Sequence, residues 1–219
     1  YSRHPGSLYR VYKALGFSSK APSTKKKRKP QKYHTPESLG IKWQLDVKYV
    51  PRACYVGEIP DKFYQYTMID EASRQRFIYP YREQSSYSTI DFVKRAIAYF
   101  GYKPKIIQTD NGFEFTYPRD CSRIHPFDRF CESIGIDHKL IRPRTPWHNG
   151  KVERSHRNDQ ERFYNFLSFY SFKDLKEQMY RYMRRSNRIP MAVLGWISPI
   201  ERRSQLEAQL ITHFGKTIQ

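Results

Sequence analysis

The sequence of 219 residues contains 40 lysines and arginines against 21 aspartates and glutamates, and its formal net charge is +19. A chain of this length can bury the core of one catalytic domain and still carry a smaller flanking piece. The positive balance favours a polyanionic partner, most commonly nucleic acid and less commonly an anionic membrane surface. The sequence contains no apolar run that could span a bilayer and no secretory pattern. We therefore expect neither membrane insertion nor secretion.

The cysteine content indicates the redox environment. Cys54, Cys121 and Cys131 are an odd number of cysteines, and none of them forms a C-x-x-C pair. This pattern favours a reducing compartment and disfavours a disulfide framework or a cysteine-based zinc site. We therefore expect the protein in the cytoplasm.

The first twenty residues predict a short amphipathic helix. Ser7 is a candidate N-cap, and Leu8, Val11 and Leu15 then recur on one helical face. A lone short helix cannot bury that apolar stripe. We expect residues 1–20 to be the end of a longer helical domain upstream, or else an arm that packs on the core.

Residues 21–40 are rich in Lys, Pro and Ser, which predicts a linker rather than folded core. At its centre lies a block of consecutive cations, which we expect to be solvated or laid along DNA phosphates. This basic block comprises Lys25, Lys26, Lys27, Arg28 and Lys29.

From residue 41 the pattern is that of an α/β domain. In residues 41–50 apolar and polar side chains alternate, which predicts a strand with Asp46 on its polar face. The order of elements predicts a mixed five-stranded sheet flanked by helices, with no internal repeat. Further strands are predicted over residues 62–70, 74–82, 103–110 and 137–143, and helices over residues 87–100, 126–135, 150–168 and 172–187.

Three carboxylates occupy positions that face away from apolar packing. Asp46 lies mid-strand, Asp110 ends the fourth predicted strand, and Glu153 opens the helix that begins near residue 150. Phosphodiester cleavage or transfer can use such a set, because two divalent ions about 4 Å apart activate the attacking oxygen and neutralise the leaving one. Mg²⁺ and Mn²⁺ prefer oxygen ligands, and the sequence has no competing His and Cys cluster at zinc spacing.

Each carboxylate also has an ordinary explanation. Asp46 is explained as well by a pair with Lys48 or with a base on the next strand. Asp110 is explained by the Asp-Asn-Gly turn that it begins. Glu153 is explained by the dipole of the helix N-terminus or by a pair with Arg157. Spacing and composition alone therefore leave a metal site as one of two interpretations.

Five segments of the chain occur in a recognisable order: WQLDVKYV, YTMIDEASRQRFIY, IIQTDNGFEF, GIDHKLIRPRTPWHNGKVERSHR and NRIPMAVLGWISPIE. Together they resemble the integrase-like catalytic domain of the DDE transposases, a branch of the RNase H-like superfamily. The combination of TDNG-x-EF with P-x-TPW-x-NGKVER is highly specific. The resemblance is strongest to bacterial insertion-sequence transposases, with retroviral and retrotransposon integrases more distant. It implies an RNase H-like catalytic core over residues 41–202, followed by a C-terminal tail over residues 203–219.

The resemblance implies that Asp46, Asp110 and Glu153 are the catalytic triad and bind two Mg²⁺ or Mn²⁺ ions. By family analogy Asp46 would bridge both ions, while Asp110 and Glu153 would each complete one site. Glu114 and Asp137 are nearby acids outside the NGKVER context. We do not assign them to the site.

Supporting roles are implied around the triad. Asn111 and Gly112 would shape the turn beside Asp110, and residues 147–150 would form the loop that leads into the Glu153 helix. An arginine-rich helix is often only a solvated face, so the DNA contacts are the weaker implication. These contacts are Asn149, Lys151, Arg154, Arg157 and Gln160.

The sequence departs from the family pattern in two places. Between Asp110 and Glu153 lie 42 residues, more than in the commonest pattern, and the excess falls at residues 116–128 as a loop insertion. Upstream, nothing supplies the His-His-Cys-Cys zinc module of retroviral integrases. Residues 7–17 instead resemble the last helix of a helix-turn-helix DNA-binding domain.

The function implied by the resemblance is DNA transposition. Activated water would hydrolyse a phosphodiester at the transposon end, and the exposed 3′-OH would then attack target DNA without ATP or a covalent protein–DNA intermediate. The implied partners are double-stranded DNA, as transposon ends and as target, and further copies of the chain in a homodimer or larger assembly. The implied location is the bacterial nucleoid.

Three other functions stay open. A tyrosine recombinase would need clustered Arg, His and Tyr rather than three carboxylates. A catalytically inactive or domesticated DNA-binding protein would keep the fold without the activity. An RNase H-like nuclease would use a different carboxylate set, typically with a fourth acid, and would lack the NGKVER motif.

Overall fold

The computed structural model describes residues 4–17, 33–57, 61–118, 121–141 and 149–215, with side chains up to residue 210. The chain divides into two compact units, residues 1–34 and residues 35–219. The basic block at residues 25–29 lies outside the described residues. Within the described part of the chain, no helix is long and apolar enough to cross a bilayer.

The first unit contains helix α1 (Pro5–Ala14). The helix is capped by His4, whose Nδ1 accepts a hydrogen bond from the Gly6 amide at 3.1 Å. The prediction of an N-cap at Ser7 is therefore wrong, because proline at the first helical position starts the helix earlier. The predicted apolar stripe is present but exposed in this unit, as Leu15 illustrates.

The second unit is built on a five-stranded sheet in the order β3-β2-β1-β4-β5. Strand β1 is antiparallel to β2 and parallel to β4, β2 is antiparallel to β3, and β4 is parallel to β5. The predicted mixed sheet is thus confirmed. The strands are β1 (Lys42–Tyr49), β2 (Tyr64–Asp70), β3 (Arg76–Tyr81), β4 (Ile106–Thr109) and β5 (Asp137–Leu140).

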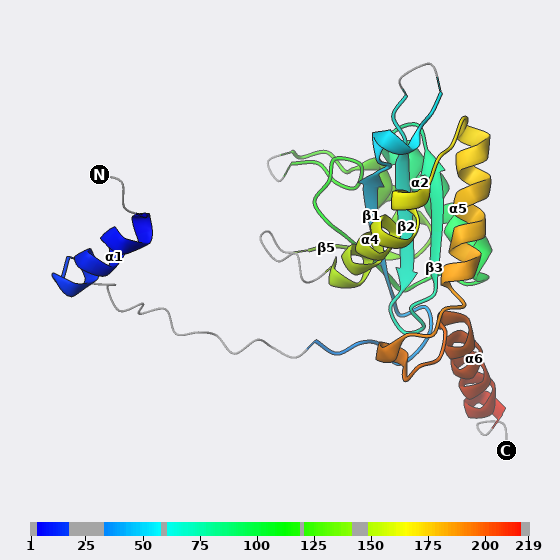
Figure 1. The fold of residues 1–219 in the computed structure, drawn as a ribbon. Coiled ribbons are helices and arrows are strands. Elements are labelled where there is room, and N and C mark those ends of the chain that lie inside the picture. Colours follow the sequence, from blue (N-terminus) through cyan, green and yellow to red (C-terminus); the bar gives the residue numbers. More distant parts are fainter. Residues whose placement is uncertain (1–3, 18–32, 58–60, 119–120, 142–148, 216–219) are drawn as a thin grey trace. The chain divides into compact units, whose positions relative to one another are not determined.

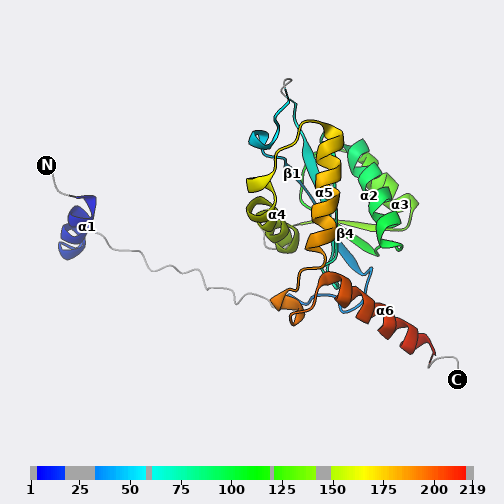
Figure 2. The same ribbon diagram turned by 45° about the vertical axis from the view of Figure 1, so that its right-hand side comes forward.

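Helices cover both faces of the sheet (Figures 1 and 2). Aromatic side chains of α2 pack on one face, where Phe100 contacts Trp43 at a centroid distance of 4.6 Å and Phe92 contacts Tyr66 at 5.5 Å. Helices α4 and α5 pack against the other face, α4 on β1 and β2 and α5 on β3. The helices are α2 (Ser86–Phe100), α3 (Pro126–Ser133), α4 (Gly150–Arg162), α5 (Phe172–Ser186) and α6 (Pro199–Gly215), with short 3₁₀ turns η1 (Arg52–Cys54), η3 (Tyr164–Phe166) and η4 (Ala192–Leu194).

The polar face of β1 is not solvated, because α4 lies over it (Figure 1). Gln44 on this face is only 1% exposed. Its Oε1 accepts from the Val152 amide at 3.2 Å, and its Nε2 donates to Glu71 Oε1 at 2.9 Å. The alternation in β1 therefore separates an apolar core from a second, polar core between the sheet and α4.

Helix α4 ends at Arg162, six residues before the predicted end at residue 168. After Arg162 the chain leaves helical geometry and pairs with the segment around η1. Phe169 donates its amide to the Cys54 carbonyl at 2.9 Å and accepts from the Val56 amide at 3.0 Å. These bonds need an extended backbone, so tertiary pairing overrides the helical spacing of the apolar residues.

Helix α6 crosses the expected boundary between core and tail at residue 203. Arg203 lies on the core, where its guanidinium donates to the Phe100 carbonyl at 2.7 Å and to Gln75 Oε1 at 3.0 Å. Leu206 is buried one turn later. The part of α6 that directly follows residue 202 therefore packs on the rest of the second unit.

Candidate active site

Two strands and one helix carry the three carboxylates predicted from the sequence: Asp46 lies in β1, Asp110 follows β4, and Glu153 lies in α4. Strands β1 and β4 are parallel neighbours whose register pairs Gln44 with Gln108. Asp46 and Asp110 each lie two residues further on, so they stand at the same level of the sheet. Glu153 lies in the first turn of α4, the helix that packs over β1 and β2.

Electrostatics shows how these side chains act on one another. Burial, followed by the charges of Asp110, Glu153 and Glu114, raises the pKa of Asp46 from 3.8 to about 7, although a hydrogen bond from the Val47 amide opposes the shift. Like charges gathered around a buried carboxylate disfavour its ionised form. A cation at this position would remove that penalty, so the acids form a centre suited to a positive ligand.

The donor set fits hard divalent ions. Among the described side chains, no three of His, Cys, Asp or Glu are grouped tightly enough to surround one metal ion. Asp46, Asp110 and Glu153 would offer carboxylate oxygens from three separate elements. Mg²⁺ usually binds one or two protein carboxylates and completes its shell with water and substrate phosphate.

Each oxygen of Asp46 lies near a nitrogen atom of the protein. Oδ1 accepts from the Val47 amide at 2.9 Å, and Oδ2 lies 3.4 Å from His156 Nδ1. Burial lowers the pKa of His156 to about 4, so its imidazole is neutral at pH 7. The other ring nitrogen, Nε2, lies 3.0 Å from the hydroxyl of Thr67, which is opposite Asp46 on β2.

Asp110 begins a tight turn directly after β4. Its Oδ1 accepts from the Gly112 amide at 3.0 Å, and Asn111 Nδ2 donates to the Ile141 carbonyl at 3.2 Å. A Cβ at Gly112 would lie 2.5 Å from Glu114 Oε2. Glycine at this position therefore makes room for the Glu114 carboxylate beside the turn.

Glu114, the acid of the TDNG-x-EF motif, is a fourth acid near the candidate site. It is 6% exposed, and Gln84 Nε2 donates to its Oε1 at 2.6 Å. Its charge contributes to the raised pKa of Asp46. Asp137, the other unassigned acid, is exposed at the opposite end of β5, where it pairs with Lys139 at 3.1 Å.

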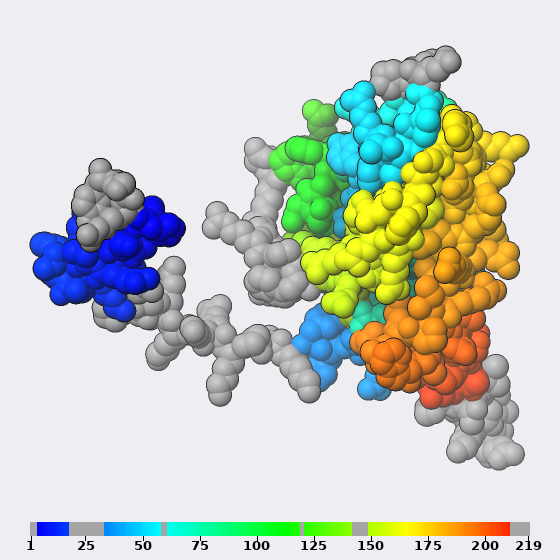
Figure 3. Space-filling view, in the orientation of Figure 1, coloured from blue at the N-terminus to red at the C-terminus, as the bar shows by residue number. Residues whose placement is uncertain are grey.

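The residues expected to contact DNA differ in their surroundings. Arg154 and Arg157 are exposed on α4, whose yellow-green surface is visible in Figure 3. Lys151 instead donates to Glu71 Oε2 at 2.5 Å in a largely buried ion pair. Gln160 Nε2 donates to the exposed Asn165 at 2.9 Å.

Asn149 is buried at the start of α4. Its Nδ2 reaches the Leu45 carbonyl at 3.5 Å, and its Oδ1 has no hydrogen-bond partner among the described residues. This amide therefore lies against β1, next to Asp46 along the strand. Trp147 and His148, which we expected in the preceding loop, lie outside the described residues.

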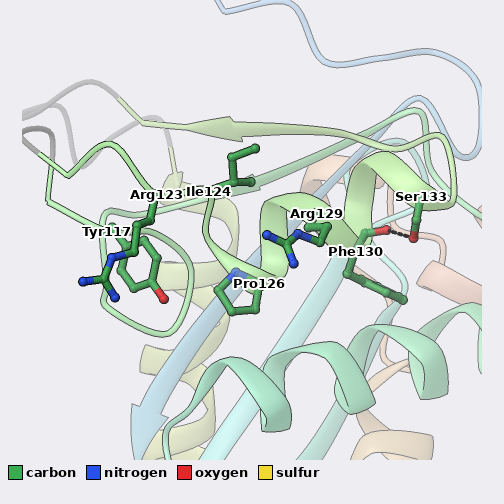
Figure 4. A pocket seen from close by; sticks show the side chains of 7 residues that line it. All are labelled: Tyr117, Arg123, Ile124, Pro126, Arg129, Phe130 and Ser133. Atoms are coloured by element: carbon green, nitrogen blue, oxygen red, sulfur yellow. Dashed lines mark hydrogen bonds between the residues drawn. The ribbon is translucent and has the colours of Figure 1, made fainter.

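A hollow of about 770 Å³ opens beside α3 (Figure 4). The part of the chain that resembles a loop insertion forms one wall, and none of the four acids lines the hollow. It therefore does not contain the candidate active site. Its lining consists of Tyr117, Arg123, Ile124, Pro126, Arg129, Phe130 and Ser133.

Known proteins share both the sequence pattern and the fold. A putative integrase, ORF3, of Spiroplasma virus SpV1-C74 is 36% identical over 142 residues, which are 60% of this chain and 38% of that protein. A retrovirus-related Pol polyprotein from transposon TNT 1-94 of Nicotiana tabacum is 34% identical over 106 residues, 48% of this chain and 8% of that protein. The chain thus spans much less than the full length of these relatives.

Solved structures with integrase or intasome in their descriptions share the fold of this chain. The HTLV-2 integrase catalytic core domain in complex with magnesium, in its trimeric form, gives a TM-score of 0.56 at 20% identity and covers 76% of this chain and 97% of that one. A chain of the simian T-cell lymphotropic virus intasome in complex with PP2A regulatory subunit B56 gamma gives a TM-score of 0.59 at 16% identity and covers 91% of this chain and 74% of that one. At these identities the likeness establishes the fold, which is RNase H-like.

The integrase core domain family accounts for the region that holds the candidate site. Its pattern matches residues 37–146, which include Asp46 and Asp110, and a second integrase core domain pattern matches residues 134–199, which include Glu153. The first match alone spans half of the sequence. The chain belongs to the integrase core domain family.

Proposed function

We propose that the chain is the catalytic core of a DNA transposase of the bacterial insertion-sequence type, with Asp46, Asp110 and Glu153 as its metal ligands. The observation that carries the proposal is that the charges of Asp110 after β4 and of Glu153 on α4 both raise the pKa of Asp46 on β1. Family membership and the uninterrupted NGKVER motif support it. The net charge of +19 suits a nucleic-acid substrate.

The chain's own residues would position the reacting phosphate and its ligands. When bound, two Mg²⁺ or Mn²⁺ ions would supply an activated attacking oxygen and neutralise the leaving oxygen. Asp46, Asp110 and Glu153 would hold these ions through their carboxylate oxygens. Exposed Arg154 and Arg157 would hold DNA phosphates next to Glu153. Water would attack first to free a 3′-OH, which would then attack the target strand, with no Ser, Tyr or Cys nucleophile.

The assembly is also a proposal. Joining two DNA ends calls for at least two catalytic cores, so we propose a homodimer or larger assembly on DNA. Structures of HTLV-2 integrase in dimeric and trimeric forms, and of a simian T-cell lymphotropic virus intasome, support multimeric use of this fold. Location at the bacterial nucleoid follows from DNA as the substrate.

Asp110→Asn and Glu153→Gln should each lower end cleavage and strand transfer by on the order of 1,000-fold, because each change removes a metal ligand. DNA binding should change little, since the basic surface is untouched. Activity is measured on labelled terminal-repeat DNA with Mg²⁺, with any upstream domain restored. Asp137→Asn, an exposed acid at the other end of β5, is the matched control and should retain activity. Wild-type strand transfer by Glu153→Gln would refute the triad.

An RNase H-like nuclease is the second candidate, and one observation favours it. Such enzymes typically use a fourth acid, and Glu114 is a buried fourth acid beside Asp46. The products of the assay separate the candidates when it is run in Mn²⁺. Strand-transfer products identify a transposase, cleavage alone identifies a nuclease, and the absence of both identifies an inactive DNA-binding protein.

Replacing all five residues of the basic block at 25–29 with Ala should weaken DNA binding equally for all sequences. Each phosphate contact that is lost should flatten the log–log slope of affinity against salt by about 0.9. Binding is measured from low to physiological salt with terminal-repeat DNA and with unrelated DNA of equal length. A loss confined to terminal-repeat DNA would contradict a phosphate-contacting linker.

A further inference from the structure

A buried chain of hydrogen bonds runs beneath α4, away from Asp46. At its near end, His156 Nδ1 lies 3.4 Å from Asp46 Oδ2, and Nε2 lies 3.0 Å from Thr67 Oγ1. The next link is Gln65, whose Nε2 donates to Thr67 Oγ1 at 2.8 Å and to Asp159 Oδ2 at 2.7 Å. Gln65, Thr67 and Asp159 are fully buried, so water does not compete for these bonds.

An ion pair fixes the direction of the hydrogen bonds at the far end. Arg76 Nη1 donates to Asp159 Oδ1 at 2.6 Å, and the Tyr182 hydroxyl donates to the same oxygen at 3.0 Å. A guanidinium keeps its proton in proteins, so Asp159 is an ionised carboxylate that only accepts. Gln65 must therefore present its NH₂ group to Asp159. The Tyr164 hydroxyl, which donates to Gln65 Oε1, fits this orientation of the amide.

The same orientation decides which nitrogen of His156 carries a hydrogen. The second N–H of Gln65 points at Thr67 Oγ1, so this hydroxyl accepts there. Among the described residues, His156 Nε2 is the other polar atom within hydrogen-bond distance of the hydroxyl, and we infer that Thr67 donates its hydrogen to it. A neutral imidazole has one donor and one acceptor nitrogen. Because Nε2 accepts, Nδ1 carries the hydrogen and faces Asp46 Oδ2. The opposite tautomer would set a nitrogen lone pair against a carboxylate.

We propose that this relay, from the Arg76–Asp159 ion pair to Thr67, holds His156 as the Nδ1–H tautomer and makes it a positioning residue for Asp46. The inference rests on the proposed function in taking Asp46 as a metal ligand. With Oδ1 bonded to the Val47 amide and Oδ2 facing His156, the plane of the carboxylate is set. Each oxygen keeps a further lone pair for an ion.

The tautomer is measured directly in uniformly ¹⁵N-labelled protein at pH 8 by long-range ¹H–¹⁵N correlation of the imidazole rings. His156→Asn removes one ring and so assigns its signals. We expect a protonated Nδ1 and an unprotonated Nε2 in the wild-type protein. A wild-type His156 that carries its hydrogen on Nε2 would overturn the relay. This measurement needs no variant of Thr67 and no catalytic turnover.

The positioning role is tested by Mn²⁺ affinity, measured by electron paramagnetic resonance of the unbound ion. Thr67→Val keeps the side-chain shape and removes the hydroxyl, while Thr67→Ser keeps the hydroxyl and is the matched control. Loss of an outer partner typically weakens metal binding 10–100-fold, so we expect Thr67→Val to bind Mn²⁺ about 10-fold more weakly than Thr67→Ser. Equal affinities of the two variants would overturn the positioning role.

A second pair of variants at the ring itself gives the same answer if Thr67→Val does not fold. His156→Asn places an amide N–H where Nδ1 stood and should bind Mn²⁺ within a few-fold of wild type, whereas His156→Leu should lose about 10-fold or more. Equal loss in both would contradict the proposal. A protein with the expected tautomer and Mn²⁺ affinities but no strand transfer would refute transposition and leave the relay intact.

Discussion

Asp46→Asn is expected to stabilise the metal-free protein at pH 8 while it abolishes cleavage and strand transfer. The folded-state pKa of Asp46 is about 7 against 3.8 for an ordinary aspartate, and burial with neighbouring acids is the cause. The unfolded chain therefore ionises this group from about pH 4, whereas the folded protein holds the proton until about pH 7. The destabilisation caused by ionisation of Asp46 therefore grows between about pH 4 and about pH 7, and it stays constant at higher pH.

The asparagine variant removes this destabilisation because it cannot ionise. A pKa shift of about three units corresponds to about 4 kcal/mol. Because the site can relax, we expect Asp46→Asn to raise the free energy of unfolding by about 2 kcal/mol at pH 8. The gain should fall below half of that value at pH 5. The measurement is urea unfolding in EDTA at both values of pH, with Asp137→Asn as the control. A loss of stability at pH 8 would contradict the convergence of charges on Asp46.

Asp159→Asn is expected to lower the free energy of unfolding by about 3–5 kcal/mol, because it leaves the Arg76 guanidinium buried without its counter-ion. The two side chains pair at 2.6 Å and are 0% and 7% exposed. Arg76 holds the pKa of Asp159 below its ordinary value although burial alone would raise it. The stability from this pair is therefore present above about pH 4 and lost as the pH falls through the lowered pKa.

A double-mutant cycle isolates the pair from the rest of the polar core. Asp159→Asn combined with Arg76→Met removes both charges, and the combined loss should be smaller than the sum of the two single losses by at least about 1 kcal/mol. Urea unfolding at pH 7 measures each variant. Additive losses would contradict a coupled ion pair. In Asp159→Asn alone, His156 should no longer be held in one tautomer, because Gln65 would lose its fixed orientation.

Local patterns in the sequence predicted the elements, and distant contacts decided their limits. Alternation in residues 41–50 is a local property and correctly predicts β1 with Asp46 on its polar face. The burial of that face was not predictable, since the covering helix α4 begins a hundred residues later. The end of α4 at Arg162 depends on bonds between Phe169 and Cys54, which no helical spacing reveals.

In the candidate site, too, local motifs predict the residues and distant contacts decide their surroundings. Motif context selects Asp46, Asp110 and Glu153, and the charges of Asp110 and Glu153 contribute to the raised pKa of Asp46. Glu114 is left unassigned in the sequence because it lies outside the NGKVER context, and its hydrogen bond from Gln84, thirty residues earlier in the chain, is visible only in the structure. The signal that could have found it is the glycine two residues before it, which makes room for its carboxylate.

Lys151 illustrates a limit of reading a basic motif as a DNA contact. The NGKVER context suggests an outward cation, but the side chain pairs with Glu71 at the end of β2. A cation held in a buried ion pair with a carboxylate is not available to a DNA phosphate. Which cation of the motif is exposed depends on where α4 sits on the sheet, and only Arg154 and Arg157 emerge.

Anomalous scattering from Mn²⁺ tests the account most directly. Crystals of the protein bound to transposon-end DNA and soaked in Mn²⁺ should show two peaks about 4 Å apart, one contacting Asp46 and Asp110 and the other contacting Asp46 and Glu153. The same soak of Asp46→Asn crystals should lose both peaks. Two peaks away from Asp46, or a Glu153 side chain turned from the ions in the DNA-bound state, would contradict it.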